Sequence, residues 1–114
     1  MVKPRPPQQG EILWLSLDPA LGHEQRGRRP VLVASATLFN SHSGFCWVVP
    51  VTSQQKGLPS ETMLPHGLPV EGALLLSQLR SIDWRARSFS VACLVDADFL
   101  DDILARLSAV LQPA

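Results

Sequence analysis

The chain contains a charged loop, Gly22-His23-Glu24-Gln25-Arg26-Gly27-Arg28-Arg29-Pro30, between two apolar segments, Glu11-Ile12-Leu13-Trp14-Leu15-Ser16-Leu17 and Val31-Leu32-Val33-Ala34-Ser35. The apolar segments are predicted to be strands, and a loop held between strands is a rigid place for a functional site. The loop sets one carboxylate among three guanidinium groups. Arginine suits phosphate because its planar fork donates paired hydrogen bonds, and a carboxylate can accept a proton. A solvated charged hairpin loop is the alternative interpretation.

Further short runs of apolar, β-branched or aromatic residues also predict strands. The runs are 45–49, which leads into a strand end over 49–53, and 73–76 and 89–95. Residues 61–64, between two prolines, are predicted to form a shorter edge strand. The connections contain Gly, Pro and Ser and are too short for strand-helix-strand units, except that Ala36–Asn40 could form one helical turn ended by Ser41–Gly44. The pattern therefore favours a small antiparallel barrel, closed or half-open.

The only long helix is predicted at the C-terminus, over about 96–111. One apolar stripe at helical spacing comprises Phe99, Leu100, Ile103, Leu104, Leu107, Val110 and Leu111. Asp96 is the expected N-cap, and the stripe is expected to pack against the barrel. The predicted fold class is therefore mainly β with a C-terminal helix.

Length and composition predict a single domain. The chain has 114 residues, of which 46% are hydrophobic and 18% charged, as in ordinary soluble domains. Residues 1–9 contain Pro4, Pro6 and Pro7 and are expected to form a flexible leader, which leaves 10–114 as the domain. The chain shows no apolar run near the roughly 20 residues that span a bilayer and no apolar secretion signal, so a cytoplasmic location without membrane contact is expected.

Charge and cysteine content restrict the function further. The formal net charge is zero, which disfavours a broad nonspecific surface for nucleic acid and favours a short local contact. Cys46 and Cys93 lie in separate apolar runs, so reduced thiols are favoured over a disulfide. No His or Cys pair has the spacing of zinc ligands, and no dinucleotide or phosphate-loop motif is present. We therefore predict no metal and no cofactor.

Several separated motifs resemble the MazF/PemK family of toxin endoribonucleases. The stretch 10–14, Asp18-Pro19 and 24–33 resembles the start of that family, and Asn40, 49–53, Lys56-Gly57 and 72–84 follow in the same order. The resemblance covers the chain from Gly10 to the C-terminal helix, and agreement of several motifs in order makes it specific. It implies a small SH3-like antiparallel β-barrel of the kind shared by CcdB and PemK toxins.

The resemblance implies a catalytic group of Glu24, Arg29 and Thr52. RNA cleavage without metal needs a base for the 2′-hydroxyl and cationic donors for the charge on the phosphorane oxygens. Glu24 matches the base and Arg29 the phosphate clamp, with a 2′,3′-cyclic phosphate and a 5′-hydroxyl as products. The structural alternatives are a carboxylate paired with Arg26 or Arg28, an arginine stacked on a barrel aromatic, and a threonine that caps a turn.

RNA-binding residues are expected around this group: Arg26, Arg28, Asn40, Ser53, Lys56, Gln78 and Arg80. Gln78 could hydrogen-bond to base edges and Arg80 to a phosphate, whereas Trp84 and Trp14 are favoured as packing residues over base-stacking ones. Ser77 stands where many relatives carry an acidic residue, and Arg80 where they often carry lysine. The recognised RNA sequence therefore cannot be carried over from the family.

The family also implies partners. They are single-stranded RNA, a second copy of the chain in a homodimer, and a cognate antitoxin whose acidic segment folds over the arginines. Two other functions are compatible with such a barrel: a non-catalytic toxin of the CcdB type, and a barrel that only binds proteins. The joint presence of Glu24, Arg29 and Thr52 argues for the endoribonuclease.

Overall fold

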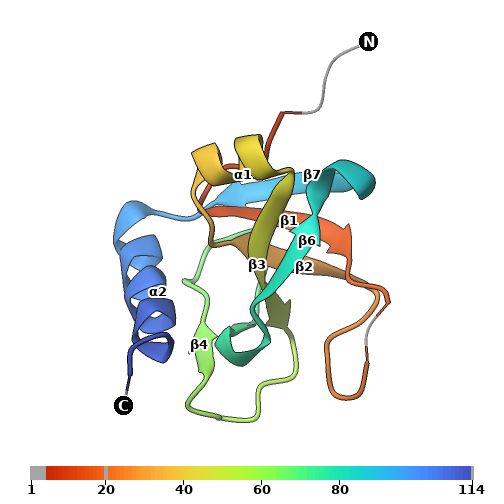
Figure 1. Cartoon of the computed structure of the whole chain (residues 1–114). Coiled ribbons are helices and arrows are strands. Elements are labelled where there is room, and N and C mark those ends of the chain that lie inside the picture. Colours follow the sequence, from red (N-terminus) through yellow and green to blue (C-terminus); the bar gives the residue numbers. More distant parts are fainter. Residues whose placement is uncertain (1–4, 20, 114) are drawn as a thin grey trace.

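The computed structural model describes residues 5–19 and 21–113. In chain order the elements are β1 (Glu11–Ser16), β2 (Arg28–Val33), α1 (Thr37–Ser43), β3 (Phe45–Thr52), β4 (Glu61–Met63), β5 (Ala73–Leu75), η1 (Leu76–Gln78), β6 (Arg80–Asp83), η2 (Trp84–Ala86), β7 (Phe89–Leu94) and α2 (Ala97–Val110). Figure 1 shows α2 on one side of a strongly bent sheet. The prediction of a mainly β fold with a C-terminal helix is confirmed.

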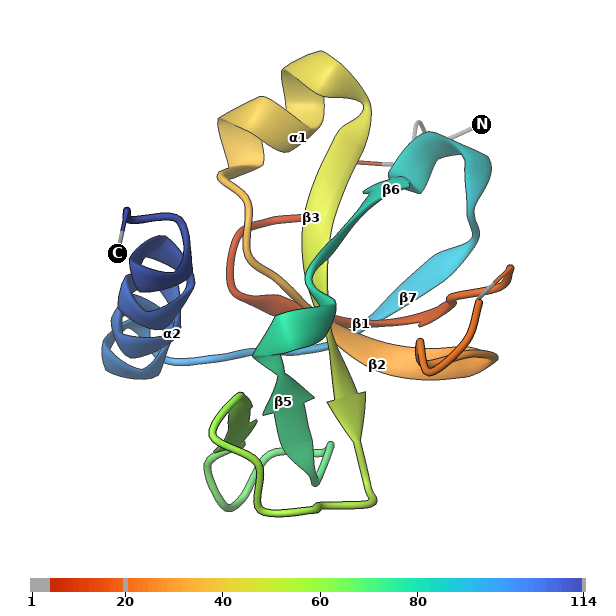
Figure 2. The same ribbon diagram turned by 60° about the horizontal axis from the view of Figure 1, so that its bottom comes forward.

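The sheet is built around β3. Its strand order is β4-β5-β3-β2-β1-β7, and β6 also pairs with β3. One edge of β3 bonds to β2, while the other bonds to β6 along Phe45–Val48 and to β5 at Val51 and Thr52. Figure 2 shows β3 running from the β6 side of the molecule to the β5 side. Among the described strands no pairing joins β6 to β7, so the antiparallel barrel is half-open.

Side chains on the two faces of the sheet form two apolar cores. Residues such as Leu13, Val31 and Val48 fill the inside of the barrel. Their alternating neighbours, such as Ile12 and Leu32, face the second core beneath α2. Because successive side chains of a strand point to opposite faces, burial on both faces explains the continuous apolar runs of β2, β3 and β5.

The C-terminal helix begins as expected. The Asp96 carboxylate accepts a 2.8 Å hydrogen bond from the backbone N–H of Phe99, which satisfies one of the free donors of the first turn. Ile103 is fully buried, and Phe99, Leu100, Leu104 and Leu107 pack against the core beneath it. The apolar stripe of α2 therefore covers the outer face of the sheet as far as Leu107, whereas Val110 and Leu111, which were predicted to belong to it, are exposed.

The segment before β1 is packed, contrary to prediction. Pro7 is buried, and its carbonyl accepts a 2.8 Å hydrogen bond from the Asn40 amide. The Gln9 side chain donates to the Ala34 carbonyl at 2.8 Å, and Arg5 forms a 2.8 Å ion pair with buried Glu11. The prediction of a leader outside the core is thus wrong for residues 5–9, because polar contacts hold them. Residues 1–4 of that predicted leader lie outside the described residues.

Other differences from prediction are local. The strand β6 was not expected, β2 begins at Arg28 rather than Val31, and α1 extends to Ser43. Cys46 is buried and Cys93 half-buried, and both are free thiols as predicted. Within the described part of the chain, no helix has the length and apolar character needed to cross a membrane.

Candidate active site

The charged loop connects β1 to β2 and is closed at its base by two hydrogen bonds. The backbone N–H of Leu17 donates to the Gly27 carbonyl at 2.9 Å, and the N–H of Gly27 donates to the Asp18 carboxylate at 3.0 Å. The Arg29 side chain donates through Nε to the Arg26 carbonyl at 3.1 Å. The loop therefore projects from a paired hairpin, with Arg28 and Arg29 at the start of β2 and Arg26 within the loop.

Glu24 lies exposed near the tip of this loop. Its carboxylate accepts a 2.6 Å hydrogen bond from the backbone N–H of Leu21. It forms no ion pair with any arginine of the described residues, so the alternative of a carboxylate paired with Arg26 or Arg28 is wrong. Glu24 lines a small cavity of about 130 Å³ together with Pro50, Gln78 and Arg80.

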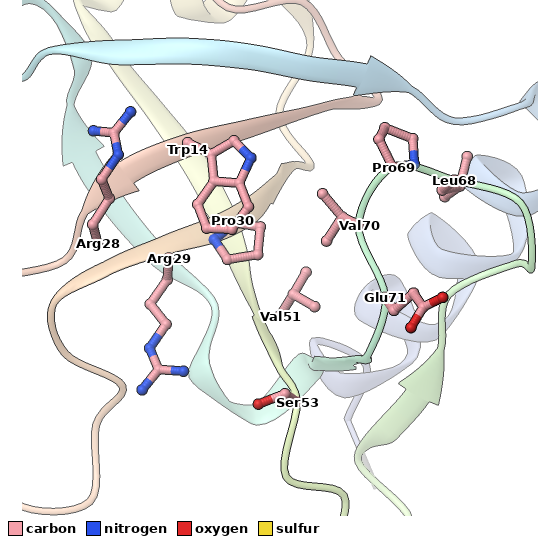
Figure 3. Close-up of a pocket in the computed structure, with 10 residues that line it drawn as sticks. All are labelled: Trp14, Arg28, Arg29, Pro30, Val51, Ser53, Leu68, Pro69, Val70 and Glu71. Carbon is pink, nitrogen blue, oxygen red and sulfur yellow. The ribbon is translucent and has the colours of Figure 1, made fainter.

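Arg28 and Arg29 line a larger cleft of about 430 Å³. Its other walls are Trp14, Pro30, Val51 and Ser53 from the sheet and Leu68–Glu71 from the segment before β5. Figure 3 shows the Arg29 guanidinium and the Ser53 hydroxyl at one end of the cleft, with Glu71 on the opposite wall. Cationic donors beside an apolar surface can hold a phosphate and an adjoining base.

Thr52 lies at the end of β3, between residues that line the two cavities. Only 4% of Thr52 is exposed, and its hydroxyl accepts a 3.1 Å hydrogen bond from the backbone N–H of Gln54. Pro50 lines the small cavity, whereas Val51 and Ser53 line the cleft. Thr52 itself lines neither cavity and is the most buried of the three predicted catalytic residues, whereas Glu24 lines the small cavity and Arg29 the cleft.

Gly72 allows the cleft wall to approach Thr52. A Cβ at Gly72 would collide with the Thr52 carbonyl oxygen, and its φ of +137° is one that other residues rarely adopt. The wall residues Leu68–Glu71 were missed as site residues in the sequence, and Trp14, which was favoured as a packing residue, is 37% exposed and lines the cleft. The available signal was the glycine after Glu71, which marks close backbone approach.

Gln78 and Arg80 contact the charged loop itself. The Gln78 side chain hydrogen-bonds to backbone atoms of His23 and Gln25, and Arg80 donates to the Leu17 carbonyl at 2.9 Å. Both were predicted as RNA contacts, and the structure places them beside Glu24 in the small cavity. Their hydrogen bonds connect η1 and β6 to the loop.

Asn40 is not available to RNA. It is fully buried, and its side-chain amide donates to the Pro7 carbonyl. Its backbone carbonyl accepts a 2.8 Å hydrogen bond from the Trp84 indole. The prediction that Asn40 binds RNA is therefore wrong, because this side chain joins α1 to the packed N-terminal segment. Trp84 is a packing residue, as favoured. Lys56 is exposed in the β3–β4 connection and lines neither cavity.

The described residues hold no group of three or more His, Cys, Asp or Glu side chains placed to bind a metal ion. The ionisable groups that line the two cavities are Glu24, Glu71, Arg28, Arg29 and Arg80. This set can accept a proton and stabilise an anion, which are the requirements of phosphodiester cleavage by an internal hydroxyl.

Comparison with known proteins shows the family to which the chain belongs. Residues 8–111 match the family described as PemK-like, MazF-like toxin of type II toxin-antitoxin system. The chain is 37% identical to the endoribonuclease toxin MazF of Escherichia coli K12, over 97% of this chain and 99% of that protein. It is 36% identical to the endoribonuclease PemK of Escherichia coli, over 91% of this chain and 81% of that protein.

Solved structures give the same result. MazF from Deinococcus radiodurans superposes with a TM-score of 0.85 at 40% identity, covering 93% of this chain and 96% of that one. MazF in a MazE–MazF structure from the same organism gives 0.79 at 36% identity, covering 93% and 95% of the two chains. The chain belongs to the MazF/PemK family of type II toxin–antitoxin toxins, a family of endoribonuclease toxins.

Proposed function

We propose that this chain is an endoribonuclease toxin that cleaves single-stranded RNA at a short specific sequence without a metal ion. The supporting observation is that one hairpin carries Glu24 in a small cavity and Arg29 in a cleft, both of which are lined by residues of β3. Family relatives with the named activity strengthen the proposal. Since the target is cytoplasmic RNA, a cytoplasmic location is part of it.

In the proposed reaction Glu24 accepts the proton of the 2′-hydroxyl, whose oxygen attacks the neighbouring phosphorus. The bond from phosphorus to the 5′-oxygen breaks, and that oxygen takes a proton from solvent. Arg29 stabilises the negative charge on the phosphorane oxygens, because a guanidinium stays protonated and donates in a fork. The Thr52 hydroxyl accepts a bond from Gln54, which leaves its own proton to donate toward the phosphate. The products are a 2′,3′-cyclic phosphate and a 5′-hydroxyl.

Arg26, Arg28, Ser53 and Lys56 complete the proposed RNA surface. Ser53 and Arg28 line the cleft, and Arg26 and Lys56 are exposed in the β1–β2 and β3–β4 connections. Exposed cations around a short cleft suit a single strand of a few nucleotides.

The proposed partners are an antitoxin and a second copy of the chain. The MazF relative from Deinococcus radiodurans has been solved with MazE, so an acidic antitoxin that covers the arginines of the loop is proposed here too. A homodimer is supported by exposed apolar side chains on α1 and the start of β3, where Phe39 and Trp47 make an edge-on contact at 5.8 Å between ring centroids.

Cleavage of RNA by the purified chain in excess EDTA tests the activity. Fragments should carry 5′-hydroxyl ends, which polynucleotide kinase labels without prior phosphatase treatment. Fragments with 5′-phosphates, or cleavage that returns only with magnesium, would contradict the mechanism. No cleavage of any RNA would favour the CcdB-like or protein-binding alternative.

Competition tests the antitoxin site. An acidic antitoxin segment should inhibit cleavage at stoichiometric amounts, and added salt should weaken both RNA and antitoxin binding. The triple variant Arg26→Ala, Arg28→Ala and Arg29→Ala should bind neither partner well. Equal binding of the antitoxin to this variant would disprove the overlapping site.

A further inference from the structure

The side chain of Gln78 hydrogen-bonds on both sides of Glu24. Its Oε1 accepts from the backbone N–H of Gln25 at 2.8 Å, and its Nε2 donates to the His23 carbonyl at 3.4 Å. These contacts bridge 53 and 55 residues of sequence. One planar amide therefore holds the two peptide groups that flank the proposed base.

The same region of the chain also holds the start of the loop. Arg80 donates to the Leu17 carbonyl at 2.9 Å, and Arg87 donates to the carbonyls of Ser16 and Asp18 at 2.6 and 3.0 Å. All three contacts come from the segment 78–87, which follows β5. A single segment distant in sequence thus contacts the loop at its base and beside its tip.

Apolar burial contributes little to holding this loop. From Asp18 to Arg26 every described residue is exposed except Gln25, which is half-buried where it meets Gln78. Loops with few buried contacts open at low free energy unless hydrogen bonds restrain them. The polar contacts from 78–87 are therefore the main restraint that links the tip to the body of the fold.

We propose that Gln78 is a positioning residue that fixes the backbone at Glu24 so that its carboxylate meets the 2′-hydroxyl. This role rests on the proposed function, and it replaces the expectation that Gln78 reads base edges. The amide carbonyl and one amide N–H are already committed to the loop. Displacement of a catalytic group by about 1 Å can reduce turnover about 100-fold, which makes such a restraint consequential.

The test compares Gln78→Ala with Gln78→Glu and a matched control. Gln78→Ala removes both bonds and should lower kcat about 10- to 100-fold, with KM nearly unchanged and the same RNA sequence cut. Gln78→Glu keeps an acceptor for the Gln25 N–H and should retain more kcat than Gln78→Ala, although its charge raises KM. The control Gln9→Ala removes a hydrogen bond from another glutamine side chain to a backbone carbonyl, that of Ala34. It should keep the wild-type kcat.

Hydrogen exchange separates positioning from loss of fold. In Gln78→Ala, amides of the loop 21–27 should exchange faster, while those of β3 stay protected as in the wild type. An unchanged kcat, or an altered cleavage sequence, would overturn the positioning role while leaving the proposed activity intact. If the wild-type chain cuts no RNA, the proposed activity fails and the positioning role falls with it.

Discussion

The Glu24 carboxylate and the Leu21 backbone are joined by a 2.6 Å hydrogen bond within the same loop. The bond uses one carboxylate oxygen, Oε1, and directs the side chain without neutralising it. The other oxygen is free to accept a proton. The same bond can form with a glutamine at this position, since an amide oxygen also accepts from a backbone N–H.

Glu24→Gln is therefore expected to stop RNA cleavage while keeping the loop in place. Arg29→Ala should do the same, because it removes a cation from the cleft and no volume from either core. Loss of a transition-state donor of this kind lowers kcat about 10²- to 10³-fold, or roughly 2.7–4 kcal/mol. Asp101→Asn and Arg106→Ala on exposed positions of α2 are charge-matched controls. Well-folded Glu24→Gln or Arg29→Ala protein that cuts RNA at the wild-type rate would refute the assignment.

Variants at Thr52 distinguish a catalytic role of its hydroxyl from a structural one. Thr52→Val keeps the shape of the side chain but loses the hydroxyl that accepts from Gln54, at a cost of about 1 kcal/mol in the free energy of unfolding. It should also lower kcat about 100-fold if the hydroxyl contacts the phosphate. Thr52→Ser restores the hydroxyl and should cut RNA normally. Wild-type turnover by Thr52→Val would leave Thr52 as a turn-capping residue only.

Gly72→Ala should destabilise the protein by more than about 1 kcal/mol, because alanine suits neither the backbone conformation nor the space beside the Thr52 carbonyl. Gly57 is a matched control: it also has a positive φ, of +68°, but a Cβ there meets nothing within 4 Å. The difference between the two variants in urea denaturation reports the steric contact together with the less favourable φ of Gly72. Equal destabilisation of the two variants would show that the close approach to Thr52 does not affect the free energy of unfolding.

Alkaline pH should destabilise the fold through Cys46. Burial raises the pKa of the Cys46 thiol from 9.0 to about 12. Above pH 9.0 the unfolded chain therefore loses a proton that the folded chain keeps, so the free energy of unfolding falls by up to about 1.4 kcal/mol per pH unit until about pH 12. Cys46→Ala should reduce this slope in denaturant titrations, and the absence of tyrosine simplifies the measurement. An identical slope in Cys46→Ala would contradict the assignment to this thiol.

Local patterns were sufficient to predict most of the fold. An apolar run identified β1, alternation identified β7, and an apolar stripe at helical spacing identified α2, whose start Asp96 marked; these signals depend on residues close in sequence. The strand β6 was missed because its residues Arg80–Asp83 contain one buried apolar side chain, Ile82, between polar neighbours. Its pairing with β3 comes from tertiary contact, which no local pattern reports.

The charged residues of the candidate site could be predicted from the sequence, but the contacts that hold them in place could not. Glu24 and Arg29 stood out because carboxylate and guanidinium groups were concentrated in one loop. Asn40 was misjudged because it commits its amide to a backbone carbonyl that is distant in sequence. Polar side chains with such partners resemble binding residues until the fold is known.

The contact between Gly72 and Thr52 also implies that the wall of the cleft and the charged hairpin can vary independently. The wall of the cleft is held against β3 by its backbone, so the exposed side chains on it, Pro69 and Glu71, can be exchanged without disturbing that contact. The proposed base and phosphate clamp, Glu24 and Arg29, lie on another part of the chain, the hairpin of β1 and β2. Evolution or engineering can therefore diversify the wall while inheriting the reaction unchanged.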